Sequence, residues 1–121
     1  MKQKVHSVSY LAKAEFEFKN GVYDLVALPT GAEVVKVSLE MVGNPTVGTV
    51  SVGFKGETTK DYFLNLENIT ANNNKHATSA KDYTATSSKA IVAEVKNASG
   101  EDAKGVLRVL YFLPSVIEVE Y

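Results

Sequence analysis

The chain has 121 residues, no cysteine, and a formal net charge of −1 from 13 Lys and Arg against 14 Asp and Glu. This length fits one domain, and a balanced charge gives no field that would attract nucleic acid or an anionic membrane. The absence of thiols excludes disulfides, thiolate catalysis and most structural zinc sites. Residues 1–10 lack the apolar stretch of a signal peptide, and no run approaches the roughly 18 apolar residues of a membrane span, so we expect a soluble protein made in the cytoplasm.

The first predicted elements are two β-strands. Residues 5–19 end in a clear alternation of apolar and charged side chains, which favours a strand over the helix that their Leu, Ala, Lys and Glu content also permits. Asn20-Gly21 predicts a type I′ hairpin turn, because both residues tolerate positive φ, and residues 22–28 form the returning strand. We therefore expect residues 1–19 to be an N-terminal arm or an edge strand, and residues 20–121 to be the sandwich domain.

The best-defined segment is residues 28–54. A Pro29-Thr30-Gly31 turn leads into a strand over residues 33–42. The apolar side chains that we expect on its inner face are Val35, Val37, Leu39 and Met41. Gly43-Asn44-Pro45 predicts a chain reversal, and residues 47–55 form the next alternating strand.

The middle of the chain is mostly polar. Tyr62, Leu64 and Leu66 alternate once more as a short strand. Residues 68–88 are rich in Asn, Ser, Thr and Ala and predict a long surface loop. Such loops are uncommon in compact domains and are often functional, so this one is either a contact element or a solvated insertion without a role.

Three further segments complete the predicted fold. Residues 90–96 form a strand with Ile91, Ala93 and Val95 inward, and residues 97–102 read as a hairpin loop. Residues 105–113 are apolar on both faces except at Arg108, as in a central strand that is covered twice or that faces a partner. Residues 116–121 form a last strand, with Ile117, Val119 and Tyr121 on its inner face and a charged outer row of Glu118 and Glu120. About eight strands and no convincing helix predict an all-β, single-domain antiparallel β-sandwich of jelly-roll-like type.

The sequence offers few groups for chemistry. His6 and His76 lack further ligands at metal spacing, and no serine has a motif that would supply a base. Two carboxylate pairs, Asp61 with Glu67 and Glu101 with Asp102, fit solvated turns better than a glycosidase site. We expect no catalytic, metal or cofactor site. Six tyrosines and five phenylalanines could form a sugar-binding platform, although strand tyrosines more often lie in cores or interfaces.

The order of motifs resembles a known family. LPTGA, the strand VVKVSLEMV, GTVSVGF, an Asn/Thr-rich stretch and GVLRVLYF follow one another between Tyr23 and Leu113. This order is similar to that of the small β-sandwich virion structural proteins of tailed bacteriophages, many of which are capsid decoration or cement proteins. The resemblance implies a non-enzymatic protein on the capsid surface. It would bind the major capsid protein at capsomer junctions, often as a homotrimer, and stabilise the shell.

The predicted contacts lie in the N-terminal arm, in the long loop and at Arg108, whose guanidinium could pair with a carboxylate across an interface or stay exposed. The residues are Val5, Val8, Tyr10, Leu11, Asn72, Asn73, Asn74, Lys75, His76, Lys81 and Arg108. The rival interpretations are a tail-spike, fibre or head-tail connector component and, in another class, a carbohydrate-binding module.

Overall fold

The computed structural model describes residues 1–120, and this part of the chain forms nine β-strands and no helix. The strands are β1 (Lys2–His6), β2 (Ser9–Glu17), β3 (Gly21–Leu28), β4 (Glu33–Phe54), β5 (Leu64–Leu66), β6 (His76–Ser79), β7 (Tyr83–Thr84), β8 (Lys89–Phe112) and β9 (Val116–Glu120). Over the same residues there is accordingly no helical segment that could span a membrane. The prediction of an all-β chain is confirmed.

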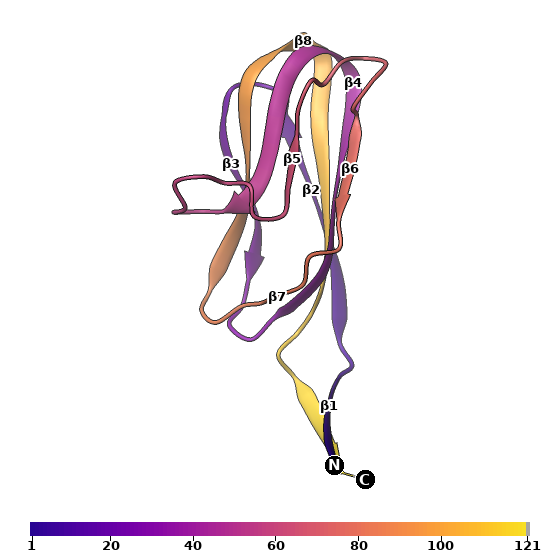
Figure 1. Ribbon diagram of the computed structural model, residues 1–121, viewed down its shortest axis with the longest axis vertical. Coiled ribbons are helices and arrows are strands. Elements are labelled where there is room, and N and C mark those ends of the chain that lie inside the picture. Colours follow the sequence, from indigo (N-terminus) through magenta and orange to yellow (C-terminus); the bar gives the residue numbers. More distant parts are fainter. Residues whose placement is uncertain (121) are drawn as a thin grey trace.

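Two very long strands organise the molecule. β4 and β8 run antiparallel along nearly their whole length, from the pair Glu33 and Phe112 to the pair Phe54 and Ile91. Four register shifts interrupt the pairing, and bulges of this kind bend and twist a strand. Figure 1 shows both strands passing over one end of the molecule, so that each contributes to both layers.

The two layers follow from the remaining pairings. Sheet I has the order β2, residues 104–112 of β8, residues 33–42 of β4, and then β6 and β7. Sheet II has the order β3, residues 89–96 of β8, residues 49–54 of β4, and then β5. Long strands that pass between the two sheets give a double-sheet jelly roll. The predicted fold class is therefore confirmed.

The core lies between the two sheets and is made of alternating side chains. Val37, Leu39 and Met41 point inward as predicted, each at most 1% exposed. Val35 is an exception and is only half-buried, whereas its neighbour Val34 is fully buried. A bulge between Val34 and Lys36 is the reason, because one extra residue exchanges the inner and outer faces of the strand before it.

The chain does not reverse direction at the two turns predicted within β4 and β8. The predicted reversal at Gly43-Asn44-Pro45 and the predicted hairpin loop at residues 97–102 are both wrong, because β4 and β8 continue through them and pair with each other there. Gly43 has φ +96°, and a Cβ at this position would lie within 3.0 Å of backbone atoms of Asp102 and Ala103. Glycine thus allows the two strands to approach closely where they cross between the sheets.

The predicted type I′ hairpin at Asn20-Gly21 is also wrong. Its flanking strands belong to different sheets, since β2 pairs with residues 104–112 and β3 with residues 89–95 of β8. Gly21 has a positive φ but Asn20 does not. Instead, the Asn20 side-chain oxygen accepts a hydrogen bond of 2.8 Å from the backbone N–H of Ala98, which ties this connection to the crossing of β8.

The predicted long loop over residues 68–88 contains more structure than expected. β6 and β7 add to the outer edge of β4, and Ile69 and Ala85 are buried at 0% and 1% exposure. The backbone groups of an edge strand pair with whatever extended segment lies beside them, which explains strands in a sequence without apolar alternation.

The N-terminal region divides into two strands with different roles. β2 pairs along its full length with β8, so residues 9–17 form an edge strand of the sandwich and not a free arm. β1 leaves the sandwich and pairs with β9 in a separate two-stranded sheet, which we call the ribbon. Figure 1 shows the ribbon projecting from the end of the sandwich opposite the crossing of β4 and β8, with the N-terminus at its tip, where Lys2 pairs with Glu120. Tyr121, the last residue of the strand predicted over 116–121, lies outside the described residues.

Candidate interaction surface

The ribbon is attached to the sandwich by two hydrogen bonds at its base. The His6 Nδ1 atom lies 2.9 Å from the backbone oxygen of Leu113. Because a carbonyl can only accept, Nδ1 carries the hydrogen and donates it. The backbone N–H of Leu113 in turn donates to the oxygen of Val8 at 2.8 Å. These bonds connect the segments that enter and leave the ribbon.

Exposed apolar side chains gather at this end of the molecule. We call residues 1–11 together with β9 the ribbon end. Ten large hydrophobic residues of the described chain are exposed, and seven of them belong to the ribbon end: Met1, Val8, Tyr10, Leu11, Val116, Ile117 and Val119. Leu11 and Ile117 are the most open of the seven after Met1, at 62% and 61%. A concentration of exposed apolar side chains at one end of a molecule indicates a contact with another macromolecule.

A hollow of about 430 Å³ adds to this surface. It lies where the ribbon joins the sandwich, and its walls include His6, Val35, Asp82 and Phe112. Val35, displaced from the core by the bulge, forms part of this wall. The hollow gives the ribbon end a concave apolar feature beside the projecting strands.

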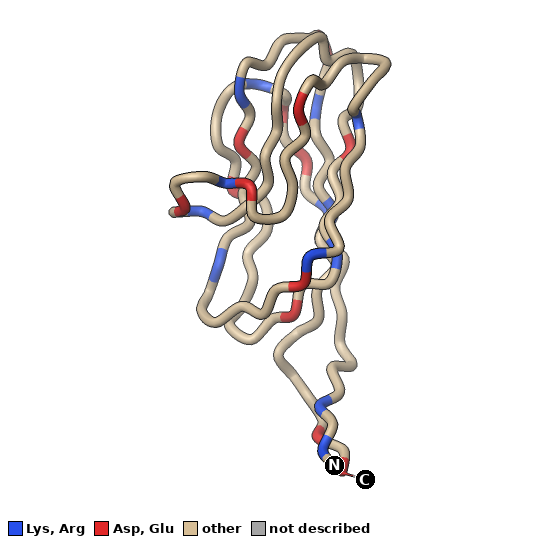
Figure 2. Tube along the Cα trace, viewed as in Figure 1, with Lys and Arg blue, Asp and Glu red and all other residues tan. Residues whose placement is uncertain are grey.

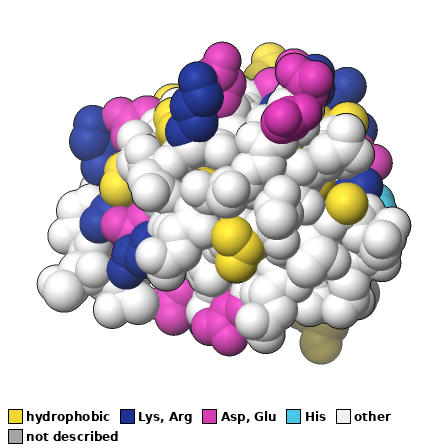
Figure 3. All heavy atoms as spheres, turned by 90° about the horizontal axis from the view of Figure 1, so that it is seen from above, with side chains coloured by type: hydrophobic (Ala, Val, Ile, Leu, Met, Phe, Trp, Pro, Cys, Tyr) yellow, Lys and Arg dark blue, Asp and Glu magenta, His cyan; other side chains and the backbone are white. Residues whose placement is uncertain are grey.

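The rest of the surface is different. Figure 2 shows Lys and Arg interspersed with Asp and Glu along the whole molecule. Figure 3 looks down on the end opposite the ribbon, where hydrophobic side chains are isolated among polar and charged ones. The exposed large hydrophobic residues are therefore distributed unevenly, with most of them at the ribbon end, which also carries charged side chains on β1 and β9.

The structure separates the predicted contact residues into two groups. Val5, Val8, Tyr10 and Leu11 all lie at the ribbon end. Residues 72–75 form a polar turn before β6, near the opposite end, since His76 pairs with Glu40 just before β4 crosses between the sheets. The two groups therefore cannot form one continuous surface.

The remaining predicted contacts have partners within the chain. Lys81 Nζ lies 3.9 Å from the centre of the Tyr62 ring and donates to the Tyr62 backbone oxygen at 3.3 Å. Arg108 donates to Glu40 on the neighbouring strand at 3.2 Å, with both side chains a little over one third exposed. A carboxylate of the same chain thus already pairs with this guanidinium.

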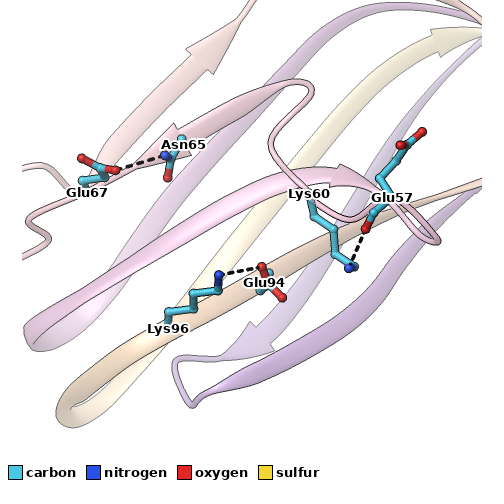
Figure 4. Close-up of polar contacts among 6 residues, drawn as sticks. All are labelled: Glu57, Lys60, Asn65, Glu67, Glu94 and Lys96. Atoms are coloured by element: carbon cyan, nitrogen blue, oxygen red, sulfur yellow. Dashed lines mark hydrogen bonds and ion pairs between the residues drawn. The ribbon is translucent and has the colours of Figure 1, made fainter.

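Of the two carboxylate pairs considered for catalysis, Asp61 and Glu67 lie in a polar groove of about 280 Å³ on the outer face of sheet II, whereas Glu101 and Asp102 lie away from it, where β8 crosses between the sheets. Asp61, Glu67 and Glu94 line this groove. Figure 4 shows Glu67 accepting a hydrogen bond from Asn65 at 3.2 Å, and Glu94 paired with Lys96 at 3.5 Å. Among residues 1–120 no group of three or more His, Asp or Glu side chains is placed to hold a metal ion.

Among residues 1–120 the aromatic side chains do not form a platform, and the sixth tyrosine, Tyr121, lies outside the described residues. Tyr10 packs edge-on against Tyr111, and Tyr23 stacks on Phe16, at separate places in the fold. The largest cluster joins Phe54, Tyr62, Phe63 and Tyr83, with tilted or edge-on rings around the core residue Phe54. Sugar platforms need coplanar exposed rings, so this arrangement does not favour a carbohydrate-binding module.

Sequence reasoning missed the contribution of β9. Ile117 and Val119 were expected on the inner face of a last strand, but they are 61% and 40% exposed because β9 lies outside the sandwich. A signal was present, since Lys2 and Lys4 near one terminus complement Glu118 and Glu120 near the other. Fold and surface together define a β-sandwich of the jelly-roll class, whose ribbon end is suited to contact another protein.

Comparison with solved structures identifies the family. The chain matches a chain in the acid-stable capsid of Helicobacter pylori bacteriophage KHP30, with 73% identity over 100% of both chains and a TM-score of 0.91. It also matches a chain of the capsid asymmetric unit of cyanophage Pam1 in fold, with 24% identity, 88% and 85% of the two chains covered, and a TM-score of 0.71. No model of a protein family and no curated protein sequence matches it. The chain belongs to a family of bacteriophage capsid structural proteins, and its location is the virion.

Proposed function

We propose that this protein is a non-enzymatic capsid decoration protein that binds the outer surface of the shell at capsomer junctions and stabilises it as a homotrimer. The observation that carries the proposal is the full-length similarity to a chain of a phage capsid. Among capsid proteins, the resemblance of the sequence to decoration proteins favours the decoration role. The major capsid protein is the proposed partner.

The distribution of apolar surface supports attachment by one end. A subunit that forms the shell itself contacts neighbours on several sides, whereas a decoration protein needs one attachment surface. Seven of the ten exposed large hydrophobic residues within 1–120 belong to the ribbon end. We therefore assign Val8, Tyr10 and Leu11, at the base of the ribbon, to contact with the shell.

Trimeric binding explains how a modest surface could suffice. A lattice presents the same junction many times, and three linked subunits that engage three equivalent sites gain affinity through effective concentration. Each contact then needs no more than an ordinary interface of about 1,600 Å².

Co-sedimentation with shells that lack this protein tests the proposal. We expect the chain to sediment with shells in near-stoichiometric amount and to raise the temperature at which the shells disrupt. Leu11→Glu, at the ribbon end, should abolish sedimentation. The matched control Val22→Glu changes another exposed aliphatic position, on β3 and 47% exposed against 62% for Leu11, and should sediment normally.

Other results would contradict the proposal. Absence of binding to shells, with binding instead to isolated tails, would favour the tail-spike, fibre or connector interpretation. Binding only to a polysaccharide column would favour a carbohydrate-binding module. The turn over residues 72–75 with His76, Lys81 and Arg108 stay predicted contacts, and Asn73→Glu and Lys81→Glu in the same assay test them.

A further inference from the structure

The ribbon has one apolar and one charged face. Residues opposite one another in an antiparallel pair share a face, and successive residues alternate. One face carries Val5 opposite Ile117 and Gln3 opposite Val119. The other carries Lys4 opposite Glu118 and Lys2 opposite Glu120. Figure 2 shows these charges near the tip.

Most of the apolar face is open in the described part of the chain, and only Val5 on it is half-buried. All five residues of β9 are exposed, with Ile117 at 61% and Val119 at 40%. A two-stranded sheet is marginally stable in water without further packing. A ribbon of five residue pairs that leaves its apolar face open therefore gains stability from a partner.

The charges on the ribbon are separated by strand. The charged side chains of β1 are both basic, Lys2 and Lys4. The charged side chains of β9 are both acidic, Glu118 and Glu120. Within one chain Lys2 pairs with Glu118 at 3.6 Å. In a two-stranded sheet each strand also has a second edge that is not paired with the other strand. The ribbon thus presents one basic edge and one acidic edge.

We infer that the ribbons of neighbouring copies of this chain pack into a common stem, with β1 of each copy beside β9 of the next. This inference rests on the proposed homotrimer and names the contact that holds it together. Each basic edge meets an acidic edge, and the Val5, Ile117 and Val119 side chains of all copies face the stem axis. A cyclic assembly is built from head-to-tail contacts of this kind, in which two different surfaces meet.

Charge complementarity favours another copy of this chain as the partner of the ribbon, and it favours a cyclic assembly over a twofold one. A twofold pair joined along identical edges would place Lys against Lys or Glu against Glu, and like charges on directly opposite residues are destabilising. In a cyclic assembly, each contact between neighbouring ribbons instead joins a basic edge to an acidic edge. The two Lys and two Glu also balance, so the assembled stem has no excess charge to attract a strongly charged partner.

Disulfide crosslinking tests the stem directly, because the chain contains no cysteine. Ile117→Cys should form disulfide-linked dimers of the full-length protein on mild oxidation, since the three side chains meet near the axis. Val47→Cys is the matched control, because it is also exposed, at 50%, but lies where β4 crosses at the opposite end. It should remain uncrosslinked. Equal crosslinking of the two variants, or none at Ile117→Cys, overturns the stem.

A charge exchange provides a second test, read out as native mass against the 13.1 kDa of one chain. The double variant Lys2→Glu/Lys4→Glu should shift the protein from trimer to monomer, with the sandwich still folded by circular dichroism. Adding Glu118→Lys and Glu120→Lys restores opposite edges and should restore the trimer. A fourfold variant that remains monomeric overturns the inference.

The outcomes also separate this inference from the proposed function. If Ile117→Lys leaves the trimer intact but abolishes co-sedimentation with shells, the ribbon contacts the shell and the stem is wrong, while the decoration role stands. If the unmodified protein is a monomer in solution and on shells, the trimer and the stem both fail. If the trimer forms through the stem but does not bind shells, the decoration role fails alone.

Discussion

The substitution Gly105→Ala tests how tightly the side chains of sheet I are packed. Gly105 lies opposite Phe16 in the pairing of β2 with β8, and a Cβ at this position would fall within 2.8 Å of three atoms of the Phe16 ring. The optimal separation of carbon atoms is about 3.5–4.0 Å, so the ring would have to move by roughly 1 Å. Phe16 is 5% exposed and stacks on Tyr23 with ring centres 5.6 Å apart, which leaves it little room.

We therefore expect Gly105→Ala to lower the free energy of unfolding by about 2 kcal/mol, within the range of about 1–3 kcal/mol for overpacked cores. Urea denaturation at one protein concentration measures this change, with an unaltered m-value. In a Phe16→Leu background the same substitution should cost much less, with a coupling energy of about 1–2 kcal/mol between the two positions.

A comparison at Gly56 separates steric overlap from backbone strain. Gly56 has φ +91° and no atom within 4 Å of a Cβ built there, so Gly56→Ala should be destabilising through backbone conformation alone. Its cost should be the same with Phe16 or with Leu at position 16. The packing argument is refuted if Gly105→Ala costs less than about 0.5 kcal/mol, or if its cost is unchanged by Phe16→Leu.

Three further outcomes are expected. Val37→Asp should prevent folding, because Val37 is 0% exposed and an unpaired buried charge costs several kcal/mol out of a total of about 5–15; a cooperative urea transition in this variant would contradict the assigned core. Glu40→Gln should lower stability by less than about 1 kcal/mol, since its pair with Arg108 is more than one third exposed, and a loss of several kcal/mol would show that the pair is buried in an assembly. Raising the salt concentration to about 1 M should lower the unfolding temperature only modestly, because salt screens exposed ion pairs that each contribute little; circular dichroism showing complete unfolding in high salt would contradict this.

Local pattern reveals which residues of this chain form strands and which side chains point inward. Val37, Leu39 and Met41 were assigned correctly because alternation in a strand depends only on the geometry of neighbouring residues. The same holds for Ile91, Ala93 and Val95. The turn at Pro29-Thr30-Gly31 was also predicted, and the backbone N–H of Ala32 donates to the oxygen of Pro29 there.

The candidate surface was only partly predictable. Val5, Val8, Tyr10 and Leu11 were singled out as an arm, and they lie at the ribbon end. Their partner strand β9 could not be assigned from local signals, because its residues are about 110 positions away and alternate like any core strand. The exposure of Ile117 follows from where β9 lies and not from its own pattern.

The sequence by itself determined the all-β character, most of the strand segments, the inner faces of the core strands around Val37 and Ala93, and the absence of an obvious catalytic motif, because these depend on residues close together in the chain. Only the tertiary structure decided what the Gly and Asn positions of the central segments do. Gly43 and residues 97–102 have the φ preferences of turns, yet the chain there crosses between two sheets, because β4 and β8 pair through both segments. Whether a flexible residue reverses a strand or bends it depends on the strand beside it. β4 and β8 are brought side by side only when the sandwich forms, so local sequence cannot reveal this pairing.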